Sequence, residues 1–256
     1  MNISSEQLIL LLPAFAAGCL VASTHVPLGI EVLKRGIIFI DLAIAQIAAL
    51  GVVIGHLVFN NAEGIYSLIF ALVFALSGGG LFAWLEAKKF QHLEAMIGAI
   101  YVFTASIAIL LLSHDPHGAE VMEKLLTGQI LWATWWPDII ITMIMYAALL
   151  LIWFTSRNNN FLVFYFIFPI AITFSVQIAG VYLVFASLII PALGVSKLKE
   201  KTKLSVGYTI ALLSIFIGLL VSLISDLPAG PMLVCSYFII STILLCSSYR
   251  RSLYIE

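Results

Sequence analysis

The chain has 256 residues, of which 62% are hydrophobic and only 10% are charged, and its mean hydropathy is +1.14. A soluble domain has about 25% charged residues, so this composition excludes an ordinary soluble protein and predicts a chain that crosses a membrane repeatedly. The net charge of −1 gives no reason to expect nucleic acid as a partner. The three cysteines, Cys19, Cys235 and Cys246, lie in apolar runs, so we predict no disulfide framework.

We predict an all-α fold, a polytopic transmembrane helix bundle that forms a single domain over residues 1–256. Nine runs approach or exceed the ~20 residues needed to cross a bilayer. They cover residues 7–26, 35–58, 65–87, 94–113, 130–155, 161–176, 178–196, 204–225 and 229–248. The sixth and seventh runs are separated only by Val176 and Gln177, which predicts a tight hairpin or a broken helix at that point.

The positions of the basic residues predict the orientation, because cytoplasmic loops of membrane proteins are enriched in Lys and Arg. With the N-terminus outside and the C-terminus in the cytoplasm, 11 of the 12 basic residues lie on the cytoplasmic side, and Lys124 lies outside. Fusing the sixth and seventh runs would place the last two basic clusters on the wrong side, so we predict nine crossings. The cytoplasmic set consists of Lys34, Arg35, Lys88, Lys89, Arg157, Lys197, Lys199, Lys201, Lys203, Arg250 and Arg251.

The second run is apolar, yet it contains a carboxylate, Asp41, and an amide, Gln46. A charged Asp near a bilayer centre costs roughly 2.5–3.5 kcal/mol on insertion scales, so it needs a partner or a watery cavity. Two interpretations remain open: the two side chains line a translocation path, or they form structural hydrogen bonds between helices. Five residues of α-helix correspond to about 500°, so the side chains diverge by ~140° and are not expected to bind one ion together in an undistorted helix.

The longest external loop, residues 113–129, contains two imidazoles and two carboxylates within seven residues, namely His114, Asp115, His117 and Glu120. These ligand types suit a divalent transition metal, although a solvated acidic loop or a surface for a docking protein would have the same composition. His56, near the outer end of the second run, is a further candidate for the translocation path; it either extends such a site or is an interfacial histidine. Residues 121–126 predict a short surface helix. His25 and His92 fall at the inner ends of predicted runs and are interpreted as interfacial side chains.

The longest cytoplasmic connection, residues 196–203, contains four lysines and Glu200. It follows Pro191, which we expect to kink or end the seventh run because proline lacks the N–H of the helical hydrogen bond. No Gly-x-x-x-x-Gly-Lys-Ser/Thr loop and no His-Glu-x-x-His motif occurs in the sequence. We therefore predict no nucleotide site, no catalytic residues and no permanently bound cofactor in this chain.

Several stretches resemble the permease subunits of the ABC transporters that import zinc, manganese and iron, the ABC-3 family. One runs from Leu28-Gly29 through Arg35-Gly36, Phe39 and Asp41 to Ala48–Gly51. A second, Gly180–Ala192, is similar to the family's Gly-x-Leu-Leu…Leu-Ile-x-Pro-Ala signature. A third, Asp226–Pro231, opens the last run as it does in that family. Leu125–Leu131 also resembles the family's Leu-Phe-Gly-Asp-Ile-Leu stretch, with Gln129 where an acid is usual.

The sequence departs from the resemblance at one position. In zinc and manganese members the second helix usually carries an Asp and, four residues later, a His, both implicated in the metal path. Aligned backward from Gly51, Gln46 occupies the His place and Leu42 the Asp place, with Asp41 one position early. A neutral amide oxygen is a weaker zinc ligand than imidazole.

The resemblance implies an importer whose transported substrate is a divalent metal ion, zinc or manganese, in the bacterial cytoplasmic membrane. It implies two permease chains, two cytoplasmic ABC ATPase chains that hydrolyse ATP, and an extracytoplasmic metal-binding protein. Coupling to the ATPase would then involve Pro191, Lys197, Lys199, Glu200 and Lys201. Two other functions remain open: an ion-gradient-driven secondary transporter with Asp41 as its coupling site, and a membrane enzyme with a metal in the external loop.

Overall fold

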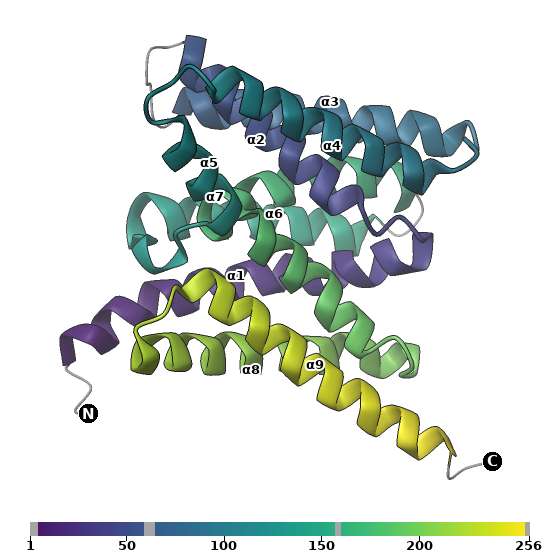
Figure 1. Cartoon of the computed structure of the whole chain (residues 1–256). Helices are drawn as coiled ribbons and strands as arrows, with labels where there is room; N and C mark the ends of the chain where they lie inside the picture. Colours follow the sequence, from purple (N-terminus) through teal and green to yellow (C-terminus); the bar gives the residue numbers. More distant parts are fainter. Residues whose placement is uncertain (1–4, 59–64, 157–159, 254–256) are drawn as a thin grey trace. The chain divides into compact units, whose positions relative to one another are not determined.

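The computed structural model describes residues 5–58, 65–156 and 160–253, so Arg157 lies outside the described residues. Within these ranges the chain is helical and contains no β-strand, which confirms the all-α prediction (Figure 1). The elements are α1 (Ser5–Arg35), α2 (Ile40–Val58), α3 (Ile65–Ala87), α4 (Leu93–Leu112), α5 (Gly118–Thr127), η1 (Ile130–Trp132), η2 (Trp135–Ile139), α6 (Ile140–Thr155), α7 (Asn160–Gly194), α8 (Glu200–Ser225) and α9 (Ala229–Leu253).

In the part of the chain that the structure describes, eight helices are long and apolar enough to cross a membrane. The polytopic bundle is therefore confirmed, and the short helix expected after the fourth run is α5. The sixth and seventh predicted runs both lie in α7. Their boundary is Gly180, whose backbone is not helical (φ 74°, ψ 163°), and not Val176–Gln177. Glycine adopts a positive φ without a steric penalty, which is why α7 breaks there. Nine crossings and the orientation remain predictions.

Several helix ends differ from the expected ones; for example, α2 begins at Ile40 and not at residue 35, and α6 begins at Ile140 and not at residue 130. α1 continues past residue 26 to Arg35 with Pro27 inside it, because proline is tolerated in membrane helices where neighbouring groups satisfy the freed backbone. α7 continues through Pro191 to Gly194, so of the two expectations for this proline, a kink or a helix end, the helix end was wrong. The Pro191 carbonyl still accepts a hydrogen bond from the N–H of Val195, at 3.1 Å. α8 begins at Glu200, which shortens the cytoplasmic connection.

The chain forms two compact units. The first unit comprises residues 1–35, 127–146 and 178–256. Within it α8 lies against α1 and α9 (Figure 1). Small residues make these contacts possible: a Cβ added to Gly18 of α1 would lie 2.8 Å from the Ile215 side chain of α8, and one on Gly218 would lie 2.8 Å from Leu233 of α9. Close approach at small residues is the usual basis of helix packing in membranes.

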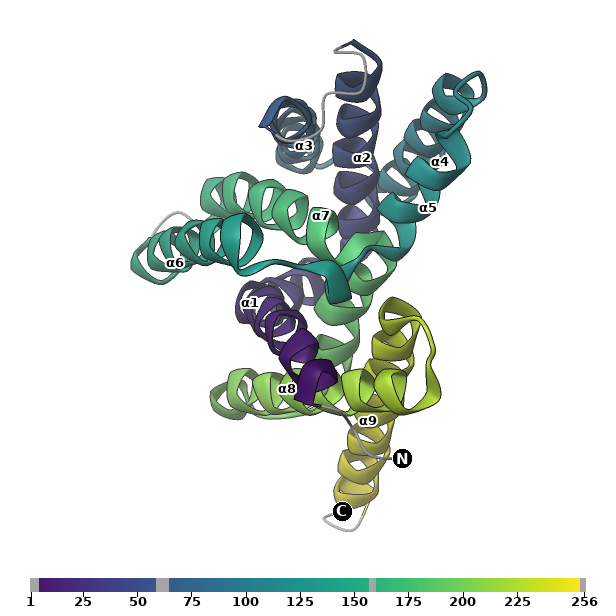
Figure 2. The same ribbon diagram turned by 90° about the vertical axis from the view of Figure 1, so that its left-hand side faces the viewer.

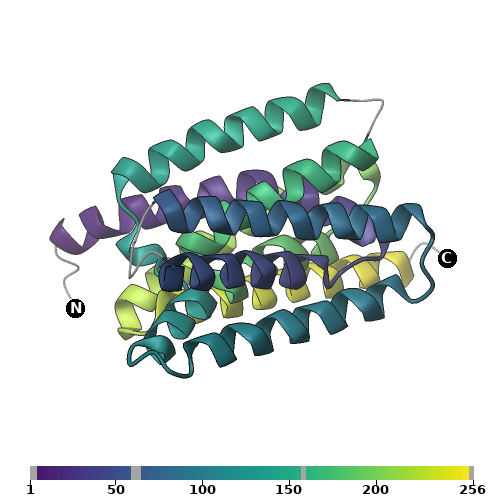
Figure 3. The same cartoon turned by 90° about the horizontal axis from the view of Figure 1, so that it is seen from above.

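The second unit comprises residues 36–126 and 147–177. Within it α2 lies between α3 and α4 (Figure 3). A Cβ added to Gly51 of α2 would lie 2.6 Å from the carbonyl oxygen of Phe70 in α3, so the two backbones are in direct contact. α5 folds back at the end of α4 and packs through its apolar side chains on Leu50, Val53 and Leu112 (Figure 2). α6 and α7 each pass through both units, so the chain does not divide into consecutive domains.

Candidate functional site

Asp41 lies in the first turn of α2 rather than near the centre of that helix, and its side chain is fully buried. Neither carboxylate oxygen has a hydrogen-bond partner within the described part of the chain. A carboxylate at a helix N-terminus is stabilised by about 0.3–1 kcal/mol, which offsets only part of the cost of its burial. Asp41 is therefore a buried acidic group without a hydrogen-bond partner among the described residues.

Gln46 is also buried, with 2% of its surface exposed. α2 has no break between Ile40 and Val58, so the separation of ~140° between Asp41 and Gln46 applies. Gln46 lies four residues before Leu50, on the face of α2 that packs with Ala108 and Leu112 of α4. Asp41 lies nine residues before Leu50, which places it on the opposite face. The two side chains do not form one ligand set.

His56 lies at the other end of α2, 15 residues or about 22 Å along the helix axis from Asp41. Its Nε2 atom is 3.3 Å from Oδ2 of Asp115, in the turn between α4 and α5. Asp115 also accepts a hydrogen bond of 2.9 Å from the N–H of His117. This hydrogen bond is the main reason that the pKa of Asp115 lies below its ordinary value of 3.8, and the His56 contact lowers it further. The structure thus brings His56 into contact with Asp115 of the loop that was expected outside, and this contact was one of the two interpretations of His56.

The other polar residues of the external loop form pairs and do not converge. Glu120 lies 2.9 Å from Lys124 and 3.8 Å from His117, and His114 contacts Ser113 at 3.1 Å. Across the described ranges, no group of three or more His, Cys, Asp or Glu side chains is arranged to hold a metal ion. Metal binding by His114, Asp115, His117 and Glu120 remains a prediction.

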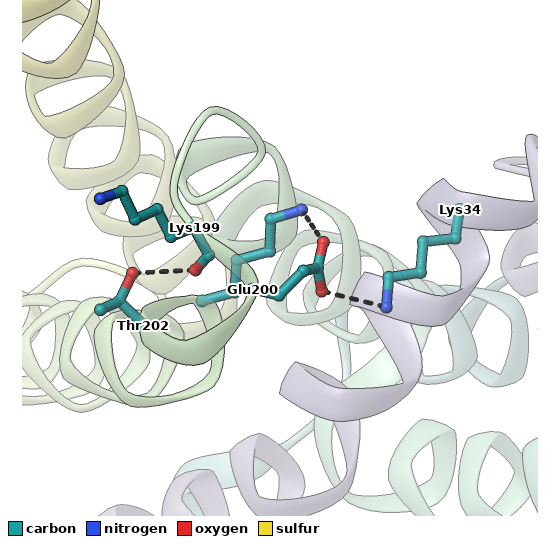
Figure 4. Close-up of polar contacts among 5 residues, drawn as sticks. Lys34, Lys199, Glu200 and Thr202 are labelled. Carbon is teal, nitrogen blue, oxygen red and sulfur yellow. Dashed lines mark hydrogen bonds and ion pairs between the residues drawn. The ribbon is translucent and has the colours of Figure 1, made fainter.

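The cytoplasmic connection is organised around Glu200, the first residue of α8. Its carboxylate lies 3.2 Å from Lys34 at the end of α1 and 2.6 Å from Lys203 (Figure 4). The hydroxyl of Thr202 donates to the Lys199 carbonyl at 2.9 Å, which secures the start of α8.

The residues predicted to couple this chain to an ATPase differ in exposure. Lys197, Lys199 and Lys201 are exposed, whereas Pro191 is buried within α7. Glu200 is exposed but is already paired with two lysines. A surface for a partner protein at this connection would therefore consist of the three exposed lysines, with Pro191 contributing to the packing of α7.

The structure corrects the interpretation of His25 as an interfacial side chain. Because α1 extends to Arg35, His25 lies well inside the helix and is fully buried. Its Nδ1 is 2.8 Å from the carbonyl oxygen of Val21, and its Nε2 has no partner among the described residues. The first run was expected to end at residue 26, next to His25, so no signal in the sequence indicated this burial.

Two further carboxylates make long-range contacts that the sequence analysis missed. Glu86 of α3 accepts a hydrogen bond from the hydroxyl of Tyr165 in α7. Glu94 of α4 accepts one from the backbone N–H of Phe39, at 2.9 Å. Both partners are more than 50 residues away in the chain, beyond the reach of any periodicity or spacing rule.

The match to a family model identifies the family of this chain. The model of the ABC 3 transport family matches residues 7–167 and 158–250, which together cover nearly the whole chain. The chain belongs to the ABC 3 transport family. Membership makes this ABC 3 protein a multi-pass membrane component of a transporter, with ATP hydrolysis in a separate subunit. This confirms the family resemblance and the prediction that the chain itself is not an enzyme.

Solved structures show the same fold. A chain of PsaBC from Streptococcus pneumoniae, solved in complex with Fab, has a TM-score of 0.72 and 20% identity over 92% of this chain and 90% of that one. A chain of an ABC transporter described as metal-chelate type, in an inward-facing conformation, has a TM-score of 0.67 and 14% identity over 96% of this chain and 90% of its own. The search of curated proteins gave no match.

Proposed function

We propose that this chain is the permease of an ATP-driven importer whose transported substrate is a divalent transition metal ion, zinc or manganese. Two copies would assemble with cytoplasmic ABC ATPase subunits in a bacterial cytoplasmic membrane and receive the ion from an extracytoplasmic binding protein. The description of one structural neighbour as a metal-chelate type transporter supports a metal-containing substrate. Family membership favours this function over a gradient-driven transporter and over a membrane enzyme.

The observation that carries the proposal is the environment of Asp41. Its carboxylate is fully buried in a helix of which 72% is buried, and no described group satisfies its oxygen atoms. An unpaired ionisable side chain inside a membrane protein usually marks a substrate or ion pathway, because its retention is otherwise costly. Carboxylate oxygen is also a ligand that Mn²⁺ and Zn²⁺ both accept.

Uptake of labelled zinc and manganese in cells that express the chain with its ATPase and binding protein tests the proposal. Asp41→Asn removes the charge and keeps the shape, so we expect uptake to fall by about tenfold or more, equivalent to ~1.4 kcal/mol or more. Assembly with the ATPase should be unchanged. Adding a chelator to the medium distinguishes a free ion from a metal chelate: only chelate import persists.

The matched control is Asp226→Asn. Asp226 is exposed and has a left-handed backbone (φ 52°), which Asn adopts as readily as Asp. This variant should transport like the wild type. If Asp41→Asn transports normally, Asp41 is not part of the path. If it assembles poorly or loses about 0.6–2 kcal/mol of stability, the side chain is instead a structural hydrogen-bond partner between helices.

A further inference from the structure

The start of α2 lacks the side chains that normally cap a helix. The Phe39 carbonyl accepts the first helical hydrogen bond, from the N–H of Ala43 at 3.0 Å, so Phe39 is the N-cap residue. In a capping box the third residue after the N-cap is Glu or Gln, whose side chain accepts the N–H of the N-cap residue. In α2 that position is Leu42, which has no acceptor. The N–H of Phe39 therefore has no acceptor in the first turn of its own helix.

Glu94 supplies this acceptor from a different helix. Its Oε1 atom lies 2.9 Å from the N–H of Phe39, although the two residues are 55 positions apart. Glu94 is in the first turn of α4, so the hydrogen bond joins the starts of α2 and α4. The Oε2 atom of the same carboxylate is buried and has no partner among the described groups. Within the described residues, the Glu94 side chain therefore hydrogen-bonds to Phe39 through its Oε1 atom.

The hydrogen bond between Glu94 and Phe39 is important because of where Asp41 lies relative to it. Asp41 follows Phe39 by two residues, and its side chain leaves α2 on the face opposite to the one that packs on α4. Glu94 extends from α4, so the two carboxylates do not share a ligand. The structural connection from Glu94 to Asp41 runs through the α2 backbone, because the hydrogen bond to Phe39 fixes where the helix begins.

We propose that Glu94 is a positioning residue for the transport path: by accepting the N–H of Phe39 it sets the start of α2 and thereby the place of Asp41. The hydrogen bond requires an acceptor oxygen at residue 94 and does not require a negative charge. Glutamine also provides a side-chain oxygen at the same distance from the backbone, whereas alanine provides none. The last step of the inference, from Asp41 to transport, rests on the proposed function.

The first measurement is backbone hydrogen exchange in the assembled transporter, in lipid nanodiscs, for peptides that cover residues 36–44. Glu94→Ala should speed exchange at the start of α2 by roughly fivefold, the factor that corresponds to a typical lost cap. Glu94→Gln should exchange like the wild type. Glu123→Ala, which changes an exposed acid on α5, is the matched control and should leave these peptides unchanged. Equal exchange in Glu94→Ala and the wild type would overturn the proposal.

The second measurement is metal uptake at matched levels of membrane protein. Glu94→Ala should lower the maximal rate by about fivefold without changing the KM for the loaded binding protein, because the path is displaced while the docking surface is not. Glu94→Gln should restore the rate. If Glu94→Gln fails as completely as Glu94→Ala, the charge itself matters and the positioning role is wrong.

The two measurements separate this inference from the proposed function. If Asp41→Asn transports normally while Glu94→Ala still loosens the start of α2 and slows transport, the cap positions α2 for another purpose, and only the role of Asp41 is overturned. If exchange and transport of Glu94→Ala are both normal while Asp41→Asn is inactive, the proposed function stands and the positioning role is overturned.

Discussion

Gly128 and Gly180 meet backbone to backbone in the first unit, and both have a positive φ, of 68° and 74°. A Cβ added to either residue would overlap the main chain of the other segment. Next to this contact the N–H of Gln129 donates to the Ile178 carbonyl at 3.3 Å. The segment that follows α5 thus lies directly against the break of α7. Only a pair of glycines permits this close approach of the two backbones.

The first prediction concerns this contact. Gly128→Ala and Gly180→Ala should each lower the free energy of unfolding by at least about 1–2 kcal/mol from backbone strain alone, and by more because the methyl group displaces main-chain atoms. Thermal unfolding of the purified protein measures the effect. Gly98→Ala is the control, because nothing lies within 4 Å of its added Cβ. Equal unfolding temperatures for all three variants would contradict the close approach.

The second prediction concerns Asp115. Since its folded pKa is depressed, the stabilisation it contributes is complete above the ordinary value of 3.8 and is lost as the pH falls through the lower folded value. Exchange of the His117 amide should therefore stay slow at all pH values above about 4. Asp115→Asn should speed that exchange at neutral pH, because the charge-assisted acceptor is lost. Glu120→Gln, which weakens the contacts of Glu120 with Lys124 and with the His117 ring but leaves the Asp115 acceptor in place, should not.

The third prediction concerns metal preference and rests on the proposed function. Gln46→His adds a borderline-soft nitrogen ligand on the face of α2 toward α4, so uptake should shift in favour of zinc relative to manganese. Competition between the two labelled metals, at equal membrane levels of the protein, gives the ratio directly. An unchanged ratio would mean that the ion does not contact this face of α2.

The fourth prediction concerns coupling to the ATPase. In a background without Cys19, Cys235 and Cys246, cysteines placed at Lys197, Lys199 or Lys201 should cross-link to the ATPase subunit because these positions are exposed. Pro191→Cys should not, since Pro191 is buried in α7. Efficient cross-linking from Pro191, or wild-type transport after residues 196–199 are scrambled, would argue against coupling through this connection.

The fifth prediction concerns the orientation. A reporter fused after Lys203 should be active in the cytoplasm, and one inserted near Gly118 should be active outside, because Lys and Arg remain on the cytoplasmic side of bacterial membranes. The nine-crossing model requires the chain to reverse direction at the break of α7. Reporters placed on the two sides of Gly180, after α6 and after α7, would lie on the same side of the membrane in that model and on opposite sides if α7 crosses once.

The fold class and the family could be predicted from the amino-acid sequence alone. Apolar runs of membrane-spanning length depend only on local composition, because each helix satisfies its own backbone hydrogen bonds. The helix α5 could also be predicted from the local sequence, because residues 121–126 were expected to form a short surface helix. The motifs at Leu28–Gly51 and Gly180–Ala192 were sufficient for the family, which the family model then confirmed.

The pairing of the polar residues depends on the tertiary structure. The first run was expected to end at residue 26 and Pro191 was expected to kink or end the seventh, yet α1 continues through Pro27 and α7 through Pro191, because packing, and not propensity, sets the length of a buried helix. The break at Gly180 depends on a segment that follows α5, and the cap on α2 depends on Glu94 in α4. Such contacts join residues that are 50 or more positions apart, so no local pattern contains them, and they exist only when the chain has folded.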